Sequence, residues 1–389
     1  MDKIETRAIR TQLDNAALHE HSAPIFLTSS FVFESAEQGR ALFAEEVSGN
    51  IYSRFSNPNV SEFITKMVQY EGAEDGLAYA TGMAAIFGSL AGLLNSGDHV
   101  LACRSLFGST HQIFMQILPR WGITCTYVDA NETNDWEKAI KSNTRVLFIE
   151  TPSNPGLDMI DLEWIGHLKA KYGLILIVDN TFATPYLQNP IVYGADVVLH
   201  SATKFIDGQG RVLGGVAVGK TELVKEMRFF ARQTGPSLSP FNAWLLSKSL
   251  ETLAVRMDRH CQNALELAEF LDSEPEVEMV KYPFLASFPQ YELARKQMKA
   301  GGGVITFNVK GGYARAARFI DALKMLTICA NLGDTRTIIT HPASTTHSKL
   351  TDEERAAIGI FPGLIRASVG LENPQDIIAD IAQALENSK

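Results

Sequence analysis

The sequence is poor in cysteine, and the cysteines that it has are scattered. Its 389 residues include four, at Cys103, Cys125, Cys261 and Cys329. None forms a Cys-x-x-Cys pair, and no group of histidines and cysteines has the spacing of zinc ligands. We therefore expect no metal site, and we expect the cysteines to be reduced thiols of the protein core.

Long apolar runs and an excess of basic residues are also missing. No segment approaches the ~20 apolar residues of a membrane-spanning helix, and the N-terminus lacks the apolar core of a signal peptide. The net charge of −9 offers no general attraction to nucleic acid or to anionic lipid. These absences favour a cytoplasmic protein that binds neither a membrane nor nucleic acid.

Length and pattern predict an α/β protein with two domains and an N-terminal arm. From about residue 57, short apolar segments alternate with helices of about ten residues, which is typical of a largely parallel sheet covered on both faces. One long helical stretch over residues 237–275 ends this alternation, and a smaller α/β domain is expected after it. We assign residues 1–50 to the arm, 51–245 to the first domain and 246–389 to the second. The pattern leaves open whether the arm packs on a neighbouring subunit or extends over the surface.

Two residues at predicted strand ends carry the first functional signal. Asp179 ends the apolar run "LILIVD", and Lys204 follows the next strand, "DVVLHSA". In a parallel sheet both project from the same edge, where ligands gather. An amine and a carboxylate in one cleft suit pyridoxal phosphate (PLP), whose aldehyde needs a lysine and whose pyridinium nitrogen needs a carboxylate. A salt-bridged lysine beside a strand-end aspartate is the alternative at this point.

The phosphate of PLP would need backbone N–H groups, hydroxyls and an arginine. Gly82 and Met83, in "YATGMAAIFGSL", open a helix of small residues and could supply the N–H groups. Ser201 and Thr203 could supply hydroxyls beside the lysine, and Arg54 is a candidate arginine. A tight contact between helix and sheet is the other explanation for the small residues.

The string "GGVAVGKT", residues 214–221, matches the phosphate-binding loop of nucleotide hydrolases letter for letter. Its interior, Val216 to Val218, is strand-like, whereas a phosphate cradle needs a turning backbone. We therefore expect Lys220 to be a surface residue at the start of the following helix.

The motifs "YSRFSNP", "ATGMAAI", "ETPSNP", "VDNTFATPYLQNP", "GADVVLHSATKF" and "LIRASVGLE" occur in an order that spans nearly the whole chain. In these motifs and in their order, the sequence resembles the Cys/Met metabolism family of PLP enzymes, the cystathionine γ-synthase group. The resemblance implies the type I fold of PLP-dependent transferases. In that fold a large PLP-binding domain with a mostly parallel seven-stranded sheet precedes a smaller C-terminal α/β domain.

The same resemblance implies a role for most of the candidate residues. Lys204 is expected to bind the cofactor aldehyde as a Schiff base and to move protons on the substrate, and Asp179 to pair with the pyridine nitrogen. Arg366 is expected to bind the substrate α-carboxylate, a bidentate task that suits a guanidinium group. The remaining cofactor-binding residues implied are Gly82, Met83, Ser201 and Thr203 at the phosphate, Asn154 near the phenolic oxygen, and Thr181 near the cofactor.

Two further residues imply an assembly. In the family, Tyr52 and Arg54 reach the phosphate in a neighbouring subunit, so each site needs a dimer, and the family generally forms homotetramers. We therefore expect a homotetramer, a dimer of dimers with shared active sites.

The sequence departs from the family pattern at two positions. Phe107, in "LFGST", stands where a tyrosine is usual, so it can stack on the cofactor but cannot move a proton. That task would fall to Lys204, Tyr52 or water. Asn331 replaces the usual serine in "CANLGD", where its amide could contact the substrate or only shape the loop.

Within the family, "DGQGRVLGG", "RQTGPSLSPFNAW" and "NLGDTRTIITHPASTTH" are most similar to O-succinylhomoserine sulfhydrylases. This favours replacement of the γ-acyloxy group by sulfide, giving homocysteine for methionine biosynthesis. Cystathionine γ-synthase, O-acetylhomoserine sulfhydrylase, methionine γ-lyase and an inactive PLP-binding relative are the alternatives. A succinyl group adds a distal carboxylate, for which Arg211 is a candidate partner; a solvated surface arginine is the other interpretation.

Overall fold

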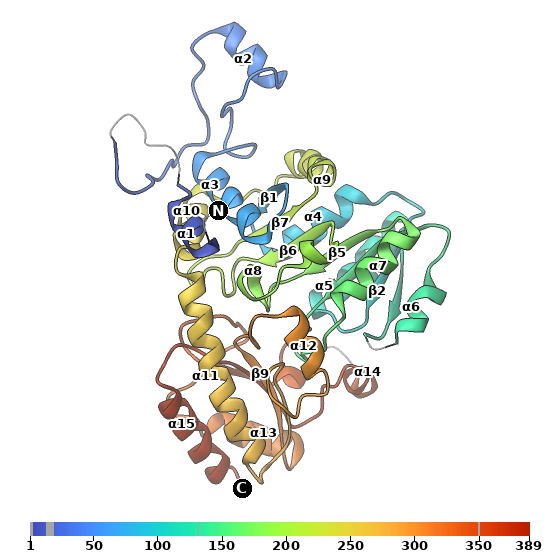
Figure 1. Cartoon of the computed structure of the whole chain (residues 1–389), viewed down its shortest axis with the longest axis vertical. Coiled ribbons are helices and arrows are strands. Elements are labelled where there is room, and N and C mark those ends of the chain that lie inside the picture. Colours follow the sequence, from blue (N-terminus) through green and yellow to red (C-terminus); the bar gives the residue numbers. More distant parts are fainter. Residues whose placement is uncertain (1–2, 13–18, 131, 349–350) are drawn as a thin grey trace.

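The structure, a computed structural model, describes residues 3–12, 19–130, 132–348 and 351–389. Two β-sheets with helices packed around them make up the body (Figure 1). The larger sheet has seven strands in the order β1-β7-β6-β5-β4-β2-β3. Its strands are β1 (Asp75–Tyr79), β2 (His99–Cys103), β3 (Thr124–Val128), β4 (Thr144–Glu150), β5 (Ile175–Asp179), β6 (Val197–Ser201) and β7 (Gly215–Gly219).

The larger sheet is parallel except at one strand. Strands β2 to β6 pair in parallel with one another, whereas β7 runs antiparallel to both β1 and β6. In β5, Leu176 and Val178 face one core cluster, and Ile175 and Ile177 face another. The strand is therefore apolar on both faces, which explains its continuous apolar sequence.

Helices cover both faces of this sheet. On one face pack α3 (Pro58–Glu71), α7 (Leu162–Tyr172) and α10 (Pro240–Leu250), and on the other pack α4 (Gly82–Leu93) and α9 (Thr221–Thr234). Shorter elements connect the strands. They are α5 (Gly108–Gln112), a π-helical turn (Ile113–Ile117), 3₁₀ turns (Leu118–Trp121 and Pro190–Tyr193), α6 (Thr133–Ala139) and α8 (Thr184–Leu187).

The second sheet lies in the C-terminal part of the chain and has five strands in the order β10-β11-β12-β9-β8. It packs against α11 (Leu253–Ser273), α13 (Gly312–Asp321) and α15 (Pro374–Asn387) around its own core. The strands are β8 (Val277–Lys281), β9 (Val304–Val309), β10 (Thr327–Ile328), β11 (Ile338–Thr340) and β12 (Leu364–Ser368). The other helices here are α12 (Tyr291–Gln297), a 3₁₀ turn (Pro342–Ser344) and α14 (Asp352–Ala357).

The long helix expected over residues 237–275 is two helices, α10 and α11, separated by Glu251 and Thr252. Side chains satisfy the backbone at this break. The carbonyl oxygen of Ser249 accepts hydrogen bonds from the Arg256 guanidinium at 2.9 Å and from the Thr252 hydroxyl at 3.2 Å. Arg256 also donates to the carbonyl oxygen of Phe205 at 2.6 Å. The sequence prediction missed the break because it depends on this contact with a distant loop.

The N-terminal region is mostly extended. It contains α1 (Ile4–Arg10) and α2 (Ala36–Phe43), and the segment around α2 projects from the body in Figure 1. The segment "APIFLTSSFVF", residues 23–33, pairs through one isolated bridge between Ser30 and Tyr52. Positions 13–18, which belong to the predicted arm, lie outside the described residues.

Three other predictions have an outcome in the fold. Residues 215–219 of the nucleotide-binding string form strand β7, and Lys220 starts α9 with an ion pair to Asp196, so the string is not a phosphate loop. Cys103 and Cys261 are buried as expected, whereas Cys125 is half-buried and Cys329 is exposed. The prediction that Cys329 packs in the core is therefore wrong. Within the described part of the chain, every helix falls short of the length and apolarity needed to cross a bilayer.

One buried ion pair connects α3 to the end of α10. The Lys66 side chain is fully buried, and its ammonium lies 3.3 Å from a Glu62 carboxylate oxygen and 3.0 Å from one of Glu251. It also donates to the carbonyl oxygen of Ser247 at 3.2 Å. Removing one member of a buried ion pair leaves the other charge uncompensated, which is strongly destabilising.

We therefore expect Lys66→Met to lower the free energy of unfolding by about 3 kcal/mol, measured by denaturant unfolding followed by far-ultraviolet circular dichroism. Lys138→Met is the matched control, since Lys138 pairs with Asp135 on the surface and should leave the midpoint nearly unchanged. Equal midpoints for the two variants would contradict the expectation.

Candidate active site

The ends of three adjacent parallel strands form the floor of the site. In the register of the sheet Glu150 of β4 lies opposite Asp179 of β5, and Asp179 lies opposite Leu199 of β6. The chain leaves β6 at Ser201 and turns at once to Lys204. The prediction that Asp179 and Lys204 share one sheet edge is therefore confirmed.

Lys204 is a half-buried amine among other polar groups. Its ammonium donates to the Asn331 side-chain oxygen at 2.6 Å, a contact between residues 127 positions apart. Burial, together with the nearby positive charge of Arg366, lowers the pKa of Lys204 to about 8. A neutral amine is the nucleophilic form, so this environment makes Lys204 reactive near neutral pH.

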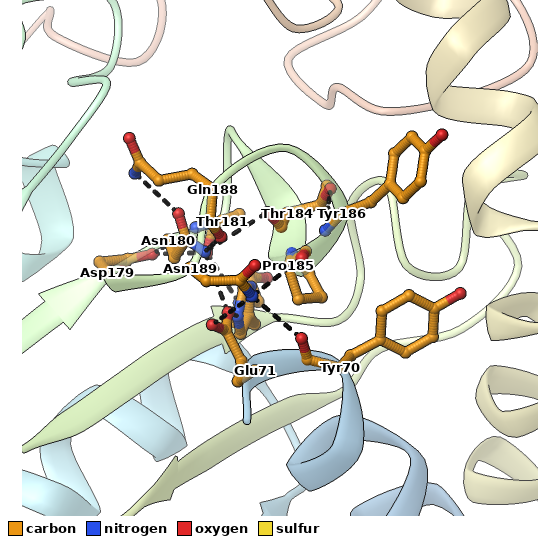
Figure 2. A network of polar contacts seen from close by, with 12 residues as sticks. Tyr70, Glu71, Asp179, Asn180, Thr181, Thr184, Pro185, Tyr186, Gln188 and Asn189 are labelled. Carbon is orange, nitrogen blue, oxygen red and sulfur yellow. Dashed lines mark hydrogen bonds and ion pairs between the residues drawn. The ribbon is translucent and has the colours of Figure 1, made fainter. Parts of the chain in front are cut away.

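Asp179 is buried, and Thr181 holds its carboxylate. The Thr181 hydroxyl and backbone N–H both donate to Asp179 Oδ1, at 2.6 and 3.0 Å, as Figure 2 shows for the side chains. The Thr181 hydroxyl oxygen in turn accepts the N–H of Ser201 at 2.9 Å. Burial raises the pKa of Asp179 above its usual value, although the Thr181 hydrogen bonds oppose this. A cation placed beside Asp179 would restore its charge.

A buried polar network holds the loop after β5 against α3 (Figure 2). Glu71 accepts hydrogen bonds from the Asn180 amide at 2.9 Å and from Asn189 at 3.3 Å, and it pairs with His200 Nε2 at 2.6 Å. Asn180 also donates to the carbonyl oxygen of Gln188 at 2.8 Å. These contacts fix the backbone of the loop that follows Asp179.

The start of α4 lies against the end of β6. The hydroxyl oxygen of Thr81 caps α4 by accepting the N–H of Ala84 at 3.0 Å. A Cβ atom on Gly82 would lie 2.5 Å from the Cβ of Ser201, so only glycine allows this approach. Thr203 lies nearby in the turn, where its hydroxyl oxygen accepts the N–H of Gly214 at 3.1 Å. A helix N-terminus with hydroxyls beside it is suited to an anion such as a phosphate, and half-buried Met83 follows Gly82 in the same first turn.

Arg366 brings the second sheet into the site. It lies on β12, and its guanidinium donates to the Asn154 side-chain oxygen at 3.0 Å and to the carbonyl oxygens of Ala330 and Asn331 at 3.1 Å. Its Nε is buried and has no hydrogen-bond partner among the described residues. Burial lowers the pKa of Arg366 to about 10. A buried cation with an unpaired donor is suited to a carboxylate ligand.

The structure does not bring every predicted residue to this edge. Arg54 donates to the carbonyl oxygen of Arg232 on α9 and lies 4.7 Å from the centroid of the Phe55 ring. Tyr52 is 39% exposed. Neither has a described contact with Lys204 or Asp179, so their role in a neighbouring subunit stays a prediction.

Arg211 has structural partners. Its guanidinium donates to the Asp207 carboxylate at 3.0 Å and to the Ser249 hydroxyl at 2.6 Å, so it connects its loop to α10. It is therefore not the freely solvated arginine of the alternative interpretation. Its predicted contact with a distal substrate carboxylate stays a prediction that these contacts do not support.

Sequence reasoning missed Glu150, the buried carboxylate next to Asp179. Its two oxygens accept the backbone N–H groups of Phe107 and Asn154, each at 2.9 Å. Phe107 immediately precedes α5, so Glu150 fixes the start of that helix. The strand-end rule that selected Asp179 also applies to "TRVLFIE" and could have found this residue. The sequence also gave no sign that Cys329 lies beside the site, where its sulfur accepts the N–H of Asn331 at 3.5 Å.

A sequence model of Cys/Met metabolism PLP-dependent enzymes matches residues 5–386. The chain belongs to this family. It is 49% identical to an O-succinylhomoserine sulfhydrylase of Pseudomonas aeruginosa, over 98% of this chain and 95% of that protein. It is 44% identical to an L-methionine γ-lyase of Treponema denticola, over 94% of this chain and 92% of that one.

A solved structure agrees with the sequence relatives. It is described as an O-acetylhomoserine (thiol)-lyase of Campylobacter jejuni and carries N'-pyridoxyl-lysine-5'-monophosphate. The two structures superpose with a TM-score of 0.95 at 36% identity, covering 99% of this chain and 100% of that one. The fold expected from the family resemblance is therefore confirmed, and the protein is an enzyme whose cofactor is PLP.

The residues at the sheet edge fit this cofactor. Lys204 offers an amine, Asp179 offers a buried carboxylate with no ion pair among the described residues, and the glycine start of α4 offers a cradle that a Cβ would fill. Bound there, PLP supplies an electron sink for negative charge at the substrate Cα. Gly82, Met83, Ser201 and Thr203 would hold its phosphate, and Phe107, Asn154 and Thr181 would surround its ring.

The lowered pKa of Lys204 gives a testable pH dependence. PLP added to the cofactor-free protein should bind covalently at a rate that rises with pH and reaches half its maximum near pH 8, because only the neutral amine attacks the aldehyde. Stopped-flow absorbance measures this rate. A rate that keeps rising up to about pH 10.5, the ordinary pKa of a lysine, would show that the site does not perturb the amine.

Proposed function

We propose that this enzyme replaces the γ-acyloxy group of O-succinylhomoserine with sulfide to give homocysteine, a step of methionine biosynthesis. The observation that carries the proposal is the 49% identity with an O-succinylhomoserine sulfhydrylase over 98% of the chain. The loops that resemble sulfhydrylases, including the one around Asn331, support the same activity.

The reaction needs one group that moves protons. Lys204 would take the proton from the substrate Cα and return protons later, since its pKa near 8 lets it exchange them at physiological pH. Phe107 stands where the family usually has a tyrosine and has no hydroxyl to share this work. The remaining candidates for further proton transfer are Tyr52 and water.

Substrate orientation would depend on Arg366. Its unpaired Nε, beside donors already held by Asn154 and by two carbonyl oxygens, suits the α-carboxylate of an amino acid. Asn331 would contact the same end of the substrate, because its side chain holds Lys204 and its carbonyl oxygen holds Arg366. Substrate binding and proton transfer would therefore share one polar cluster.

The active form would be a homotetramer built from dimers with shared sites. Large apolar side chains of the N-terminal region are solvent-exposed in the single chain, among them Leu27, Val32 and Phe43. Such exposure is costly unless another surface covers it. A neighbouring chain bound there would place Tyr52 and Arg54 at its partner's phosphate.

A second candidate is γ-elimination, as in a methionine γ-lyase. It is favoured by the 44% and 45% identity with two L-methionine γ-lyases over more than nine-tenths of the chain. The two activities differ in their products, because elimination releases α-ketobutyrate and ammonia without an added nucleophile.

We expect Lys204→Ala to lose both the visible absorption band of the bound cofactor and all measurable turnover, because the alanine cannot bind the aldehyde. Lys220→Ala is the matched control, since Lys220 lies on the surface at the start of α9. Absorbance spectra measure the cofactor band, and a homocysteine assay measures turnover. Turnover retained by Lys204→Ala would reject the assignment.

We also expect faster steady-state turnover with O-succinylhomoserine and sulfide than with O-acetylhomoserine or with cysteine. Cysteine as the better nucleophile would instead make the enzyme a cystathionine γ-synthase.

Arg211→Ala should lower stability without changing the ratio of the two ester rates, because Arg211 is held by Asp207 and Ser249. A selective loss of the succinyl ester rate would instead assign Arg211 to the distal carboxylate.

A further inference from the structure

Glu150 has an unusual environment for an acidic residue. It is 6% exposed, and its partners among the described residues are two backbone N–H groups rather than a lysine or an arginine. Burying a carboxylate without a cation is costly. Core packing alone would be served better by an apolar residue at the end of β4, so the charge calls for another explanation.

The two N–H groups belong to two different walls of the site. Oε2 accepts from Phe107, at the start of α5, and Oε1 accepts from Asn154, in the loop after β4. The side chain of Asn154 then accepts from Arg366 of β12 at 3.0 Å. One carboxylate therefore fixes the backbone of the predicted stacking residue and, through Asn154, the predicted carboxylate-binding arginine.

Glu150 also acts on Asp179 through its charge. Burial and the neighbouring Asp179 raise the pKa of Glu150 well above the usual carboxyl range, against the two N–H groups that lower it. On the other side of Asp179 lies His200 of β6, which pairs with Glu71 of α3. A cation beside Asp179 would relieve the repulsion between the two carboxylates and allow both to be ionised.

We propose that Glu150 is a positioning residue of the cofactor site, which fixes Phe107 and Asn154 and strengthens proton binding at the ring nitrogen through Asp179. The inference rests on the proposed roles of Asp179 and Phe107. The backbones of neighbouring strands lie about 5 Å apart, and two charges at a separation of this order interact in a protein by at least one pKa unit.

The test uses the Glu150→Gln holoenzyme. Glutamine keeps the size of the side chain, but its NH₂ group cannot accept one of the two N–H groups, and it carries no charge. We expect weaker circular dichroism of the bound cofactor, because the ring is held less firmly. We also expect the ring nitrogen to lose its proton about one pH unit lower than in the wild type, because removing a negative charge lowers proton affinity. Nitrogen NMR of cofactor labelled at the ring nitrogen measures this midpoint.

Glu163→Gln is the matched control, since Glu163 on α7 is exposed and pairs with Lys296. It should leave both readouts unchanged. Wild-type dichroism together with a wild-type midpoint in Glu150→Gln would overturn the proposal.

Glu150→Asp decides the question should Glu150→Gln fail to fold. It keeps the charge but shortens the reach, so the dichroism should weaken while the midpoint stays near that of the wild type. Unchanged dichroism would contradict the proposal that Glu150 positions the ring. A lowered midpoint would contradict the proposal that its charge strengthens proton binding at the ring nitrogen. Failure of the Lys204→Ala test would instead reject the cofactor assignment itself, whatever the Glu150 variants show.

Discussion

The parallel alignment of β4, β5 and β6 is the constraint on which the site depends. Because parallel strands end at the same edge, three residues that are distant in the chain meet there: Glu150, Asp179 and Ser201. The next turn adds Lys204, and α4 adds its N-terminus. A shift of one residue in the register of β5 would turn Asp179 to the opposite face and remove the carboxylate from the cleft.

Charge within the site is nearly balanced, but it is not arranged in simple pairs. Lys204 and Arg366 bring positive charge, and Asp179 and Glu150 bring negative charge. None of the four forms an ion pair with another among the described residues, and amides, hydroxyls and backbone groups hold them instead. Burial therefore lowers the pKa values of the cations and raises those of the acids, which keeps these groups ready to exchange protons with a ligand.

Local pattern was enough to predict the strands that end at Asp179 and before Lys204, the α/β class and the shared edge of these two residues, because each depends on short-range periodicity. Contacts between distant segments were not predictable in this way. The hydrogen bond from Lys204 to Asn331 and the break at Thr252 are two examples, since each depends on a partner that only the folded chain supplies. The family resemblance named Arg366 and Asn154 but not the carboxylate behind them. Glu150 was overlooked because its motif was interpreted for Asn154 alone.

Arg256, at the break between α10 and α11, also affects how the reactive amine is anchored. It donates to the carbonyl oxygens of Phe205 and Ile206, the two residues after Lys204, and to that of Ser249. A lysine side chain has many rotamers, and holding it in one costs conformational entropy. By immobilising the peptide units directly behind Lys204, a single guanidinium leaves only the side chain itself to be ordered. The same guanidinium that satisfies the helix break thus limits the movement of the backbone that carries the amine.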